Sequence, residues 1–322
     1  MKKIGILTSG GDAPGMNSCI RAAVRAALAN NLEIFGIRWG YAGLIQGDII
    51  PLNRRTVANI IHQGGTILGT ARSEEFRTKE GRAKAIKMLQ DKGIEGLILI
   101  GGDGTFRGGT LLSQECGVSV VGIPGTIDND CYGTDYTIGF DTAINTALEA
   151  IDRIRDTATA HDRLFFVEVM GRHTGFIALE SGIAGGVEEF LIPEVPMSID
   201  ELSQHLEENY KKGKRSAIVI VAETEQPGES FHIAQEVKNK TGFDSRVCIL
   251  GHIQRGGAPT ARDRVLASKL GAAAVQALID GRSGYTVGEI NREISYTPLK
   301  DTWEKKKTLH AGLTDILKIL SD

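Results

Sequence analysis

The chain contains 322 residues, of which 37 are basic and 40 acidic, so its formal charge is −3. This near balance argues against a nucleic-acid surface and against a disordered acidic tail. The length is enough for two domains of ordinary size, and a hydrophobic content of 41% can build a real core. The 40 glycines and the low aromatic content of 6% are typical of an α/β enzyme with many tight strand-to-helix turns.

The cysteines are scattered and form no CxxC pair: Cys19, Cys116, Cys131 and Cys248. This spacing argues against zinc and redox sites and favours reduced thiols in a cytosolic protein. A strand-like segment follows the first residues with no signal peptide ahead of it. No apolar run approaches the length that spans a membrane. We therefore expect a cytoplasmic protein without a membrane or nucleic-acid partner.

The pattern predicts a strand over residues 3–8, a glycine-rich turn over 9–15 and a helix over 16–29. Strand, glycine-rich turn and helix in this order point backbone N–H groups at a phosphate. The turn matches neither the G-x-G-x-x-G nor the Walker A pattern. Arg21 and Arg25 lie four residues apart on one face of the predicted helix, which is a solvated basic face unless an anionic ligand binds there.

The next segments are predicted as strand, loop, short helix, glycine-rich loop and charged helix: residues 32–38, 41–47, 56–62, 64–73 and 78–92. A strand over 96–100 then leads into Gly101-Gly102-Asp103-Gly104-Thr105. Glycines around an aspartate at a strand end let the backbone approach a polyphosphate, and Asp103 can hold Mg²⁺ directly or through water. Lipid kinases and NAD kinases carry a similar GGDGT, so this motif predicts a nucleotide site without naming the acceptor.

A buried strand over residues 118–123 precedes Pro124-Gly125-Thr126-Ile127-Asp128-Asn129-Asp130. In an extended segment, residues two apart share a face, so we expect Asp128 and Asp130 to face one cleft. The carboxyl end of a parallel strand is where open α/β sheets place their chemistry. The alternative is a solvated turn, because Asp and Asn are ordinary turn residues.

The second half continues the alternation. Predicted helices and strands occupy residues 141–160, 164–169, 199–212, 217–222, 231–240, 246–250 and 260–280. The strand ends carry Arg172, Glu223 and the segment 251–257. The basic residues 212–215 are either a ligand site or a helix end that complements its dipole. The last forty residues show no motif beyond a closing helix from residue 308. Alternating strands and helices predict doubly wound, mostly parallel sheets.

These pieces form a set suited to phosphoryl transfer. Glycines and Asp103 hold the donor polyphosphate, Arg72 and Arg172 face the transferring group, and Asp128 takes the proton of the acceptor hydroxyl. Further cations remain: Arg163, Arg246, His252 and Arg255. So many cations beyond the donor site predict an acceptor that already carries a phosphate.

Five motifs, in order and spacing, resemble those of bacterial ATP-dependent 6-phosphofructokinases over roughly residues 1–290. They are LTSGGD at 7–12, GGDG at 101–104, PGTIDND at 124–130, MGR at 170–172 and GHIQRGG at 251–257. PGTIDND and GHIQRGG are specific, whereas GGDG alone is not. The resemblance implies two Rossmann-like domains with the active site in the cleft between them. One covers residues 1–138 plus about 252–304 and binds ATP; the other covers 139–251 plus about 305–322 and binds the sugar phosphate.

The resemblance also implies residue roles. Asp128 is the base for the 1-hydroxyl of fructose 6-phosphate, helped by Arg172 and Thr126. The ATP site is implied at Gly11, Arg72, Ser73, Gly102, Asp103, Gly104 and Thr105, with Asp103 also holding Mg²⁺. The sugar-phosphate site is implied at Thr126, Ile127, Asp128, Arg163, Met170, Gly171, Arg172, Glu223, Arg246, His252, Ile253, Gln254 and Arg255. Within it His252 and Arg255 take the 6-phosphate, and Arg163 and Arg246 reach in from a neighbouring subunit of a homotetramer.

An effector pocket between subunits is implied as well, with ADP or GDP as activator and phosphoenolpyruvate as inhibitor. Its matching positions are Arg21, Arg25, Arg54, Arg155, Gly186, Glu188, Lys212 and Lys214. The chain departs from the family pattern at Asn59, Thr224 and Phe176. The first puts the strength of the effector response in doubt, and the second affects the sugar loop.

The nearest alternative is a pyrophosphate-dependent phosphofructokinase. Such relatives usually have Asp where this chain has Gly104 and Lys where it has Gly125, so two small residues favour ATP. A lipid or NAD kinase would explain GGDGT but not PGTIDND. A catalytically silent nucleotide sensor is the alternative from another class; its expected mark is loss of Asp128 or Asp103, and both are present.

Overall fold

The computed structural model describes residues 1–171, 173–224, 228–309, 312–313, 315–316 and 319. The chain divides into two compact units. The first comprises Met1–Thr142 and Arg255–Lys307, and the second comprises Ala143–Gln254 and Thr308–Asp322. Each is therefore built from two separate stretches of sequence. Over the described residues, no helix is both long enough and apolar enough to cross a membrane.

The first unit, all of whose residues are described, holds a seven-stranded sheet in the order β11-β10-β5-β4-β1-β2-β3. Its strands are β1 (Lys3–Thr8), β2 (Glu33–Ile37), β3 (Ile49–Leu52), β4 (Gly96–Gly101), β5 (Ser119–Pro124), β10 (Tyr285–Ile290) and β11 (Glu293–Pro298). The inner strands pair in parallel, and the edge strands β3 and β11 pair antiparallel to their neighbours. The sheet is thus parallel where it carries the succession of strand, turn and helix that the sequence predicts.

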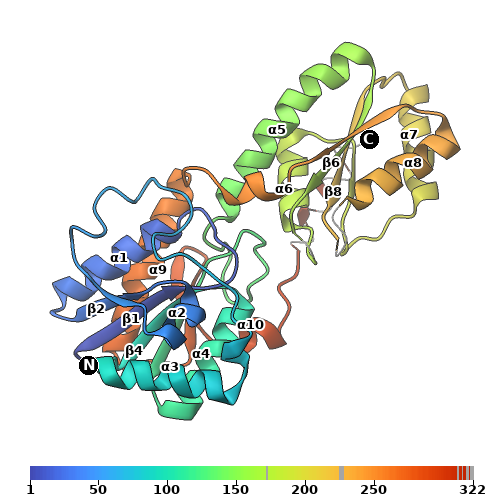
Figure 1. Ribbon diagram of the computed structural model, residues 1–322. Helices are drawn as coiled ribbons and strands as arrows, with labels where there is room; N and C mark the ends of the chain where they lie inside the picture. The colour runs from blue at the N-terminus through green and yellow to red at the C-terminus, as the bar shows by residue number, and fades with distance from the viewer. Residues whose placement is uncertain (172, 225–227, 310–311, 314, 317–318, 320–322) are drawn as a thin grey trace. The chain divides into compact units, whose positions relative to one another are not determined.

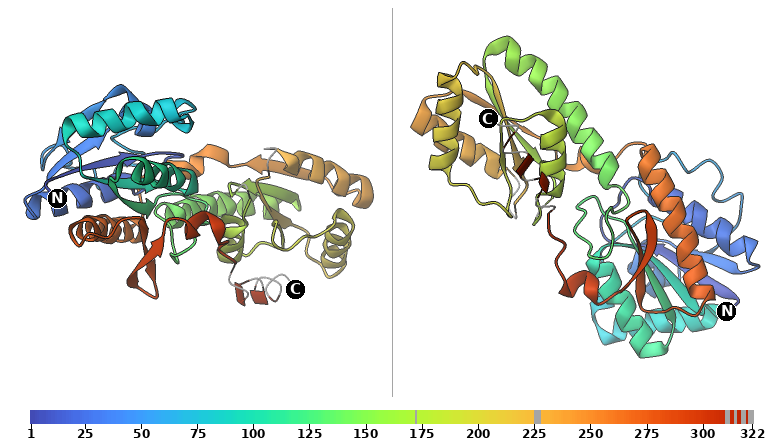
Figure 2. Two further views of the ribbon diagram at one scale, coloured as in Figure 1. Left: turned by 90° about the horizontal axis from the view of Figure 1, so that it is seen from below. Right: turned by 180° about the vertical axis from the view of Figure 1, so that it is seen from behind.

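Helices lie on both faces of this sheet (Figures 1 and 2). They are α1 (Met16–Ala29), α2 (Gly40–Gln46), α3 (Lys79–Lys92), α4 (Asp103–Cys116), α9 (Ala261–Ile279) and α10 (Asp301–Glu304), with the 3-10 turn η1 (Glu75–Arg77). One core joins side chains of α2, α3 and α4 to strand residues such as Leu97 and Leu99. On the other face α9 approaches so closely that a Cβ on Gly96 would lie 3.2 Å from Leu278 Cδ2.

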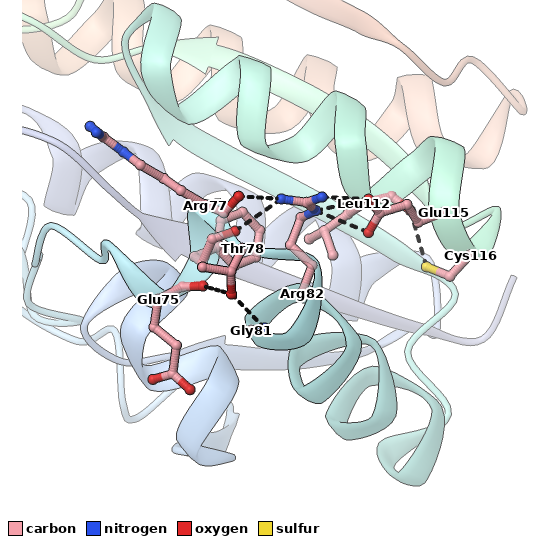
Figure 3. Close-up of polar contacts among 9 residues, drawn as sticks. Glu75, Arg77, Thr78, Gly81, Arg82, Leu112, Glu115 and Cys116 are labelled. Atoms are coloured by element: carbon pink, nitrogen blue, oxygen red, sulfur yellow. Dashed lines mark hydrogen bonds and ion pairs between the residues drawn. The ribbon is translucent and has the colours of Figure 1, made fainter.

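Arg82 of α3 ties this helix to α4 (Figure 3). Its side chain, 6% exposed, pairs with Glu115 at 2.8 Å, and its Nη1 donates to the Arg77 carbonyl at 2.8 Å. Thr78 caps the same helix, because its hydroxyl accepts the N–H of Gly81 at 3.0 Å. The contacts therefore join the turn η1, the start of α3 and the end of α4.

We expect Arg82→Met to lower the free energy of unfolding by about 1–3 kcal/mol, because it leaves the Glu115 carboxylate and the Arg77 carbonyl without their donor. Glu115 keeps 30% exposure, so water recovers part of the loss. The loss in free energy of unfolding is measured by urea denaturation, from the first unfolding transition. Glu115→Gln, which keeps an acceptor, is the control and should cost less. Equal stability of Arg82→Met and wild type would contradict this account.

The second unit holds, among its described residues, a parallel four-stranded sheet in the order β7-β8-β6-β9. Its elements are α5 (Phe140–His161), whose first turn belongs to the first unit, β6 (Leu164–Val169), α6 (Phe176–Gly185), β7 (Glu189–Leu191), α7 (Ile199–Lys211), β8 (Ala217–Ala222), α8 (Glu229–Thr241), β9 (Ser245–Ile249) and the 3-10 turn η2 (Gly251–Arg255), whose last residue belongs to the first unit. Leu202 and Leu206 of α7 and Val237 of α8 pack on Phe166 and Val219 of the sheet.

The α/β class with mostly parallel sheets is confirmed, but two local predictions were wrong. Residues 41–47 were expected as a loop and instead lie largely in α2. Tyr41 stacks on Phe76 with ring centroids 3.9 Å apart, so packing outweighs the glycines. Residues 56–62 were expected as a helix and instead form turns. Asn59 has φ +59°, a left-handed backbone that interrupts a helix.

Several elements were not predicted: β3, α6, β7, the β10–β11 hairpin and α10. They are short, or they lie in the last forty residues, where no motif was found. The predicted closing helix from residue 308 falls partly outside the described residues.

Candidate active site

Three glycine-rich segments follow neighbouring strands of the first sheet. β5, β4 and β1 are adjacent and parallel, so the segments after them meet at one edge. Backbone hydrogen bonds join them directly: Ser9 N donates to Ile100 O, and Gly125 N donates to Gly101 O, both at 3.0 Å. This is the carboxyl edge of a parallel sheet, where α/β proteins bind ligands.

The turn after β1 and the turn after β4 pack so tightly that only glycine fits at Gly101. A Cβ there would lie 2.4 Å from the Ser9 carbonyl and 2.5 Å from Thr105 Oγ1. Thr105 Oγ1 donates to Ser9 O at 3.0 Å. Gly10 has φ +90°, which L side chains rarely adopt. The two turns predicted to hold phosphate thus form one backbone surface.

Asp103 is the first residue of α4 and is exposed. Its Oδ1 accepts the N–H of Gly104 at 2.6 Å, and Arg107 lies 3.7 Å from its Oδ2. A Cβ added at Gly102 or Gly104 would meet no heavy atom within 4 Å. The Asp103 side chain is thus largely exposed, at 62%, and it follows the turn after β4 that is predicted to hold phosphate.

The Asp103 carboxylate fits a Mg²⁺ ion that arrives bound to a nucleotide. Among the described residues there is no group of three or more His, Cys, Asp or Glu side chains that could hold a metal. Mg²⁺ usually binds through one or two carboxylates together with substrate phosphates and water. A single exposed carboxylate at Asp103 matches that mode of binding and does not match a metal cage made by protein alone.

The loop of residues 64–73 is anchored at both ends of its glycine-rich part. Asn17 of α1 donates to the carbonyl of Gly64 at 3.1 Å and accepts from Ile67 N at 2.7 Å. Thr70 Oγ1 donates to Gly10 O at 2.7 Å. Arg72, which follows, is exposed. The structure therefore holds Thr70 against the turn that contains Gly11, and the predicted ATP contacts Arg72 and Ser73 follow two and three residues later.

Residues 124–139, here called the acceptor loop, carry Asp128 and Asp130. A Cβ on Gly125 would lie 2.8 Å from Ile100 Cγ2 and 3.2 Å from Met16 Cε, so the loop starts against the core. Thr137 Oγ1 donates to Thr126 O at 2.6 Å, and Asp128 N donates to Thr126 Oγ1 at 3.3 Å. These bonds fix the part of the loop that presents Asp128, which is half-buried.

The expectation that Asp128 and Asp130 lie on an extended segment was wrong. Residues 127 and 128 form a turn, and Asn129 has a left-handed backbone with φ +54°. The two carboxylates nevertheless influence each other. Burial and then the charge of Asp128 raise the pKa of Asp130 to about 6. Asp130 is exposed as a residue, so water screens part of this effect.

A buried carboxylate supports the end of the acceptor loop. Asp263 of α9, 1% exposed, accepts the N–H of Gly139 at 2.9 Å and that of Thr142 at 2.8 Å. Burial raises its pKa, and these hydrogen bonds oppose the rise. Sequence reasoning had no signal for this residue, because its partners lie more than a hundred positions away.

Lys307 is a second residue that sequence reasoning missed. Its Nζ donates to Asn129 Oδ1 at 2.8 Å and to the Asp135 carbonyl at 2.7 Å. The lysine lies in a tail that showed no motif. The only available signal was the basic run Lys305-Lys306-Lys307, which by itself indicates a solvated surface.

Arg255 lies beside the glycine-rich turn after β1, in its own unit. Its Nη1 donates to the Asp12 carbonyl at 3.2 Å, and a Cβ on Gly11 would lie 2.3 Å from the same nitrogen. His252 and Ile253, grouped with it by sequence, are exposed and belong to the second unit. The role of Arg255 toward a sugar 6-phosphate stays a prediction.

In the second unit, the carboxyl ends of β6 and β8 bring several predicted sugar contacts together. Met170 N donates to the fully buried Gln254 Oε1 at 2.8 Å, and Glu223 N donates to Val169 O at 2.7 Å. Gly171 has φ +148°, and a Cβ there would lie 2.4 Å from the Thr174 carbonyl. The predicted catalytic Arg172 lies outside the described residues.

Arg163 and Arg246 lie at the opposite, amino-terminal edge of the same sheet. Arg163 precedes β6 and Arg246 is near the start of β9. A strand rises roughly 3.3 Å per residue, so this edge is about 16 Å from the carboxyl end of the six-residue β6. A cavity of about 330 Å³ at this edge is lined by Arg163, Lys214 and Asp244 among others. Within one chain, these arginines are separated from Met170 and Glu223.

Three of the predicted effector positions meet in the second unit. Arg155 Nη2 donates to the carbonyls of Gly185 at 2.8 Å and Gly186 at 2.6 Å, and its Nη1 lies 3.3 Å from Glu188. The others are Arg21, Arg25 and Arg54 of the first unit and Lys212 and Lys214 of the second. Arg25, Arg54 and Lys212 are exposed.

Comparison with known proteins adds the family context. A model of the phosphofructokinase family matches residues 3–278. The chain is 59% identical over 321 residues to "ATP-dependent 6-phosphofructokinase 1" of Thermus thermophilus, covering 100% of both. It is 50% identical over 331 residues to the ATP-dependent 6-phosphofructokinase of Halothermothrix orenii, again covering 100% of both.

Solved structures show the same fold. Phosphofructokinase from Saccharomyces cerevisiae superimposes with a TM-score of 0.90 at 36% identity, covering 100% of this chain and 48% of the yeast chain. This chain thus spans about half the length of that one. A pyrophosphate-dependent phosphofructokinase from Marinobacter aquaeolei has a TM-score of 0.86 at 21% identity and covers 99% of this chain and 91% of its own; at that identity it shows the fold alone.

Proposed function

The chain belongs to the phosphofructokinase family, and from that premise we propose that it transfers the γ-phosphoryl group of ATP to the 1-hydroxyl of fructose 6-phosphate. The products are fructose 1,6-bisphosphate and ADP. The observation that carries the proposal is the shared edge of the first sheet. There the glycine-rich turns after β1 and β4 lie directly beside the loop that presents Asp128. Donor phosphates and a base are thereby held on neighbouring strands.

The residues of the first unit divide the work of the reaction. Backbone N–H groups of the turns containing Gly11 and Gly102 bind the polyphosphate, and Arg72 adds a positive charge. Asp128 accepts the proton of the sugar hydroxyl as the hydroxyl attacks, since a carboxylate lowers the barrier as charge develops on oxygen. Asp103 would hold Mg²⁺, which supplies charge neutralisation for the transferring phosphoryl group.

The second unit supplies the sugar-phosphate contacts. Met170, Gly171 and Glu223 cluster at the carboxyl ends of β6 and β8, and we assign them with Arg172 to the sugar. Arg163 and Arg246 lie at the far edge of that sheet. For this reason we propose that they serve the site of another copy, in a homotetramer whose active sites are completed across subunits.

ATP is the proposed donor because of the space around Gly104. A Cβ there would meet no heavy atom within 4 Å, so the region beside Asp103 is open to a nucleotide. The full-length relatives at 59% and 50% identity are named ATP-dependent.

The deciding experiment measures fructose 1,6-bisphosphate formation from fructose 6-phosphate and Mg²⁺, with ATP and pyrophosphate as separate donors. Turnover with ATP alone supports the proposal. Turnover with pyrophosphate would show that the open space at Gly104 does not select the donor. Folded protein that binds nucleotide but turns over neither donor would instead support a nucleotide sensor.

We also propose regulation by ADP or GDP and by phosphoenolpyruvate at the predicted effector positions. Arg25→Ala and Lys214→Ala are expected to leave kcat without effector within about twofold of wild type and to abolish the response to both ligands. Arg153→Ala is the matched control, since Arg153 lies on α5, is exposed, and pairs with Glu149 of the same helix. Unchanged activation and inhibition in both variants would remove these residues from the effector site.

A further inference from the structure

The segment after α10 packs against the acceptor loop through Lys305 and Lys307. Lys307 Nζ donates to Asn129 Oδ1 at 2.8 Å and to the Asp135 carbonyl at 2.7 Å. Two residues earlier, Lys305 Nζ lies 5.2 Å from the centroid of the Tyr132 ring. Lys305 has extended dihedrals, φ −106° and ψ 137°, and residues two apart in an extended segment share a face. Lys305 and Lys307 therefore contact the loop together, and Lys306 between them is exposed.

Asn129, the first partner of Lys307, controls the direction of the loop next to Asp128. It is 2% exposed, and its left-handed backbone, φ +54°, turns the chain between Asp128 and Asp130. Residues other than glycine rarely adopt this conformation unless their surroundings hold it. The surroundings here are two donors to one oxygen, because Asn129 Oδ1 accepts from Thr137 N at 3.0 Å as well as from Lys307.

Lys307 also links two separate points of the acceptor loop, Asn129 and Asp135. Asn129 Nδ2 donates to the Asp135 carbonyl over a long 3.3 Å, whereas Lys307 donates to that same carbonyl at 2.7 Å. One ammonium thus bridges two points of the loop that are six residues apart. A donor with full charge forms stronger hydrogen bonds than a neutral amide.

We propose that Lys307 is a positioning residue for phosphoryl transfer: it holds Asn129 and the Asp135 carbonyl together and thereby fixes the turn that aims Asp128 at the acceptor hydroxyl. The inference rests on the proposed function, since it assigns Asp128 the role of base. With this assignment, the C-terminal stretch of the first unit contributes to catalysis. The positive charge of Lys307 also lowers the pKa of Asp130, whereas burial and the charges of Asp128 and Asp103 raise it.

The first test compares Lys307→Met with Lys306→Met in steady-state kinetics. Methionine keeps an unbranched side chain and removes every N–H donor. We expect Lys307→Met to lower kcat by about 10- to 100-fold, because small displacements of a reacting group carry costs of this size. KM for ATP should stay within about twofold, since the ATP-binding turns are untouched. Lys306→Met should match wild type, and Lys307→Arg should recover part of the loss.

The second test asks whether an N–H donor at this position is what matters. Activity of Lys307→Ala is measured with added ethylammonium and, as control, with tetramethylammonium at the same concentration. Ethylammonium carries N–H donors and should restore activity several-fold, whereas tetramethylammonium has none and should not. A residue that only stabilised the fold would respond to neither ion.

Asn129→Gly provides a route that does not depend on substituting the lysine. Glycine accepts the left-handed backbone and removes the acceptor. This variant should lose kcat to a similar extent, and adding Lys307→Met to it should change kcat by less than about twofold, because losing either residue already breaks the bridge from Asn129 through Lys307 to the Asp135 carbonyl. If Lys307→Met does not fold, an unchanged kcat in Asn129→Gly would still overturn the role of Lys307, because that variant loses the contact with Lys307 together with those to Thr137 and Asp135.

Asp128→Asn, assayed alongside, separates failure of this inference from failure of the proposed function. Loss of activity in Asp128→Asn with unchanged kcat in folded Lys307→Met or in Asn129→Gly would overturn the role of Lys307 and leave the base in place. An active Asp128→Asn enzyme would overturn the proposed function itself, and with it the inference.

Discussion

Asp128→Asn is expected to lower kcat by about 10²- to 10⁴-fold, the range that a positioned general base contributes. Asparagine keeps the shape of the side chain and cannot take the proton of the sugar hydroxyl. The backbone of the acceptor loop should be unchanged, because its fixing bonds run through Thr126, Asn129 and Thr137. KM for fructose 6-phosphate should change far less than kcat. Single-turnover measurements with ATP would show that the chemical step is the one slowed.

Asp130→Asn serves as the matched control, because it makes the same change two residues away. Its kcat at neutral pH should fall by less than about tenfold. Burial and the charge of Asp128 raise the pKa of Asp130 to about 6. An inflection of kcat/KM near pH 6 that comes from Asp130 should therefore be absent in Asp130→Asn. Equal losses in both variants would deny Asp128 a special role.

The strand ends of this site could be predicted from sequence because their causes are local. A short apolar run such as Val120 to Ile123 that leads into a proline and a glycine indicates a buried strand that ends there. Parallel order then places the ends of β1, β4 and β5 at one edge. The positions of Asp103 and Asp128 along the chain are thus enough to expect them at one site.

Two features could not be predicted from the sequence, the helix α2 and the turn at Asn129, because both depend on residues far away along the chain. The helix α2 exists because Tyr41 stacks on Phe76 and donates to the Thr105 carbonyl, although two glycines bound it. The turn at Asn129 depends on Lys307, 178 positions later. Periodicity and propensity describe residues that are neighbours along one helix or strand. The contacts of Tyr41 and Lys307 join distant parts of the chain, so they leave no periodic pattern in the sequence.

Gly104→Asp is expected to lower kcat/KM for ATP by about 100-fold or more, since a new carboxylate beside the polyphosphate repels it at close range. The substitution should leave the fold intact. Gly104 already lies in the first turn of α4, a Cβ there meets no heavy atom within 4 Å, and an acidic residue is favourable near a helix N-terminus. Nucleotide binding and thermal melting, measured on the same protein, separate the two effects.

Gly104→Ala distinguishes volume from charge as the reason for donor choice. Alanine adds the Cβ without the carboxylate, so it should cost ATP turnover less than about fivefold if charge dominates. A loss as large as that of aspartate would mean that the nucleotide itself needs the space above Gly104. Gly125→Lys cannot serve the same purpose, because its Cβ would lie 2.8 Å from Ile100 and 3.2 Å from Met16 in the core. Gly104→Asp alone should therefore weaken ATP use without creating pyrophosphate use, since the added carboxylate excludes one donor and supplies no cation for the other.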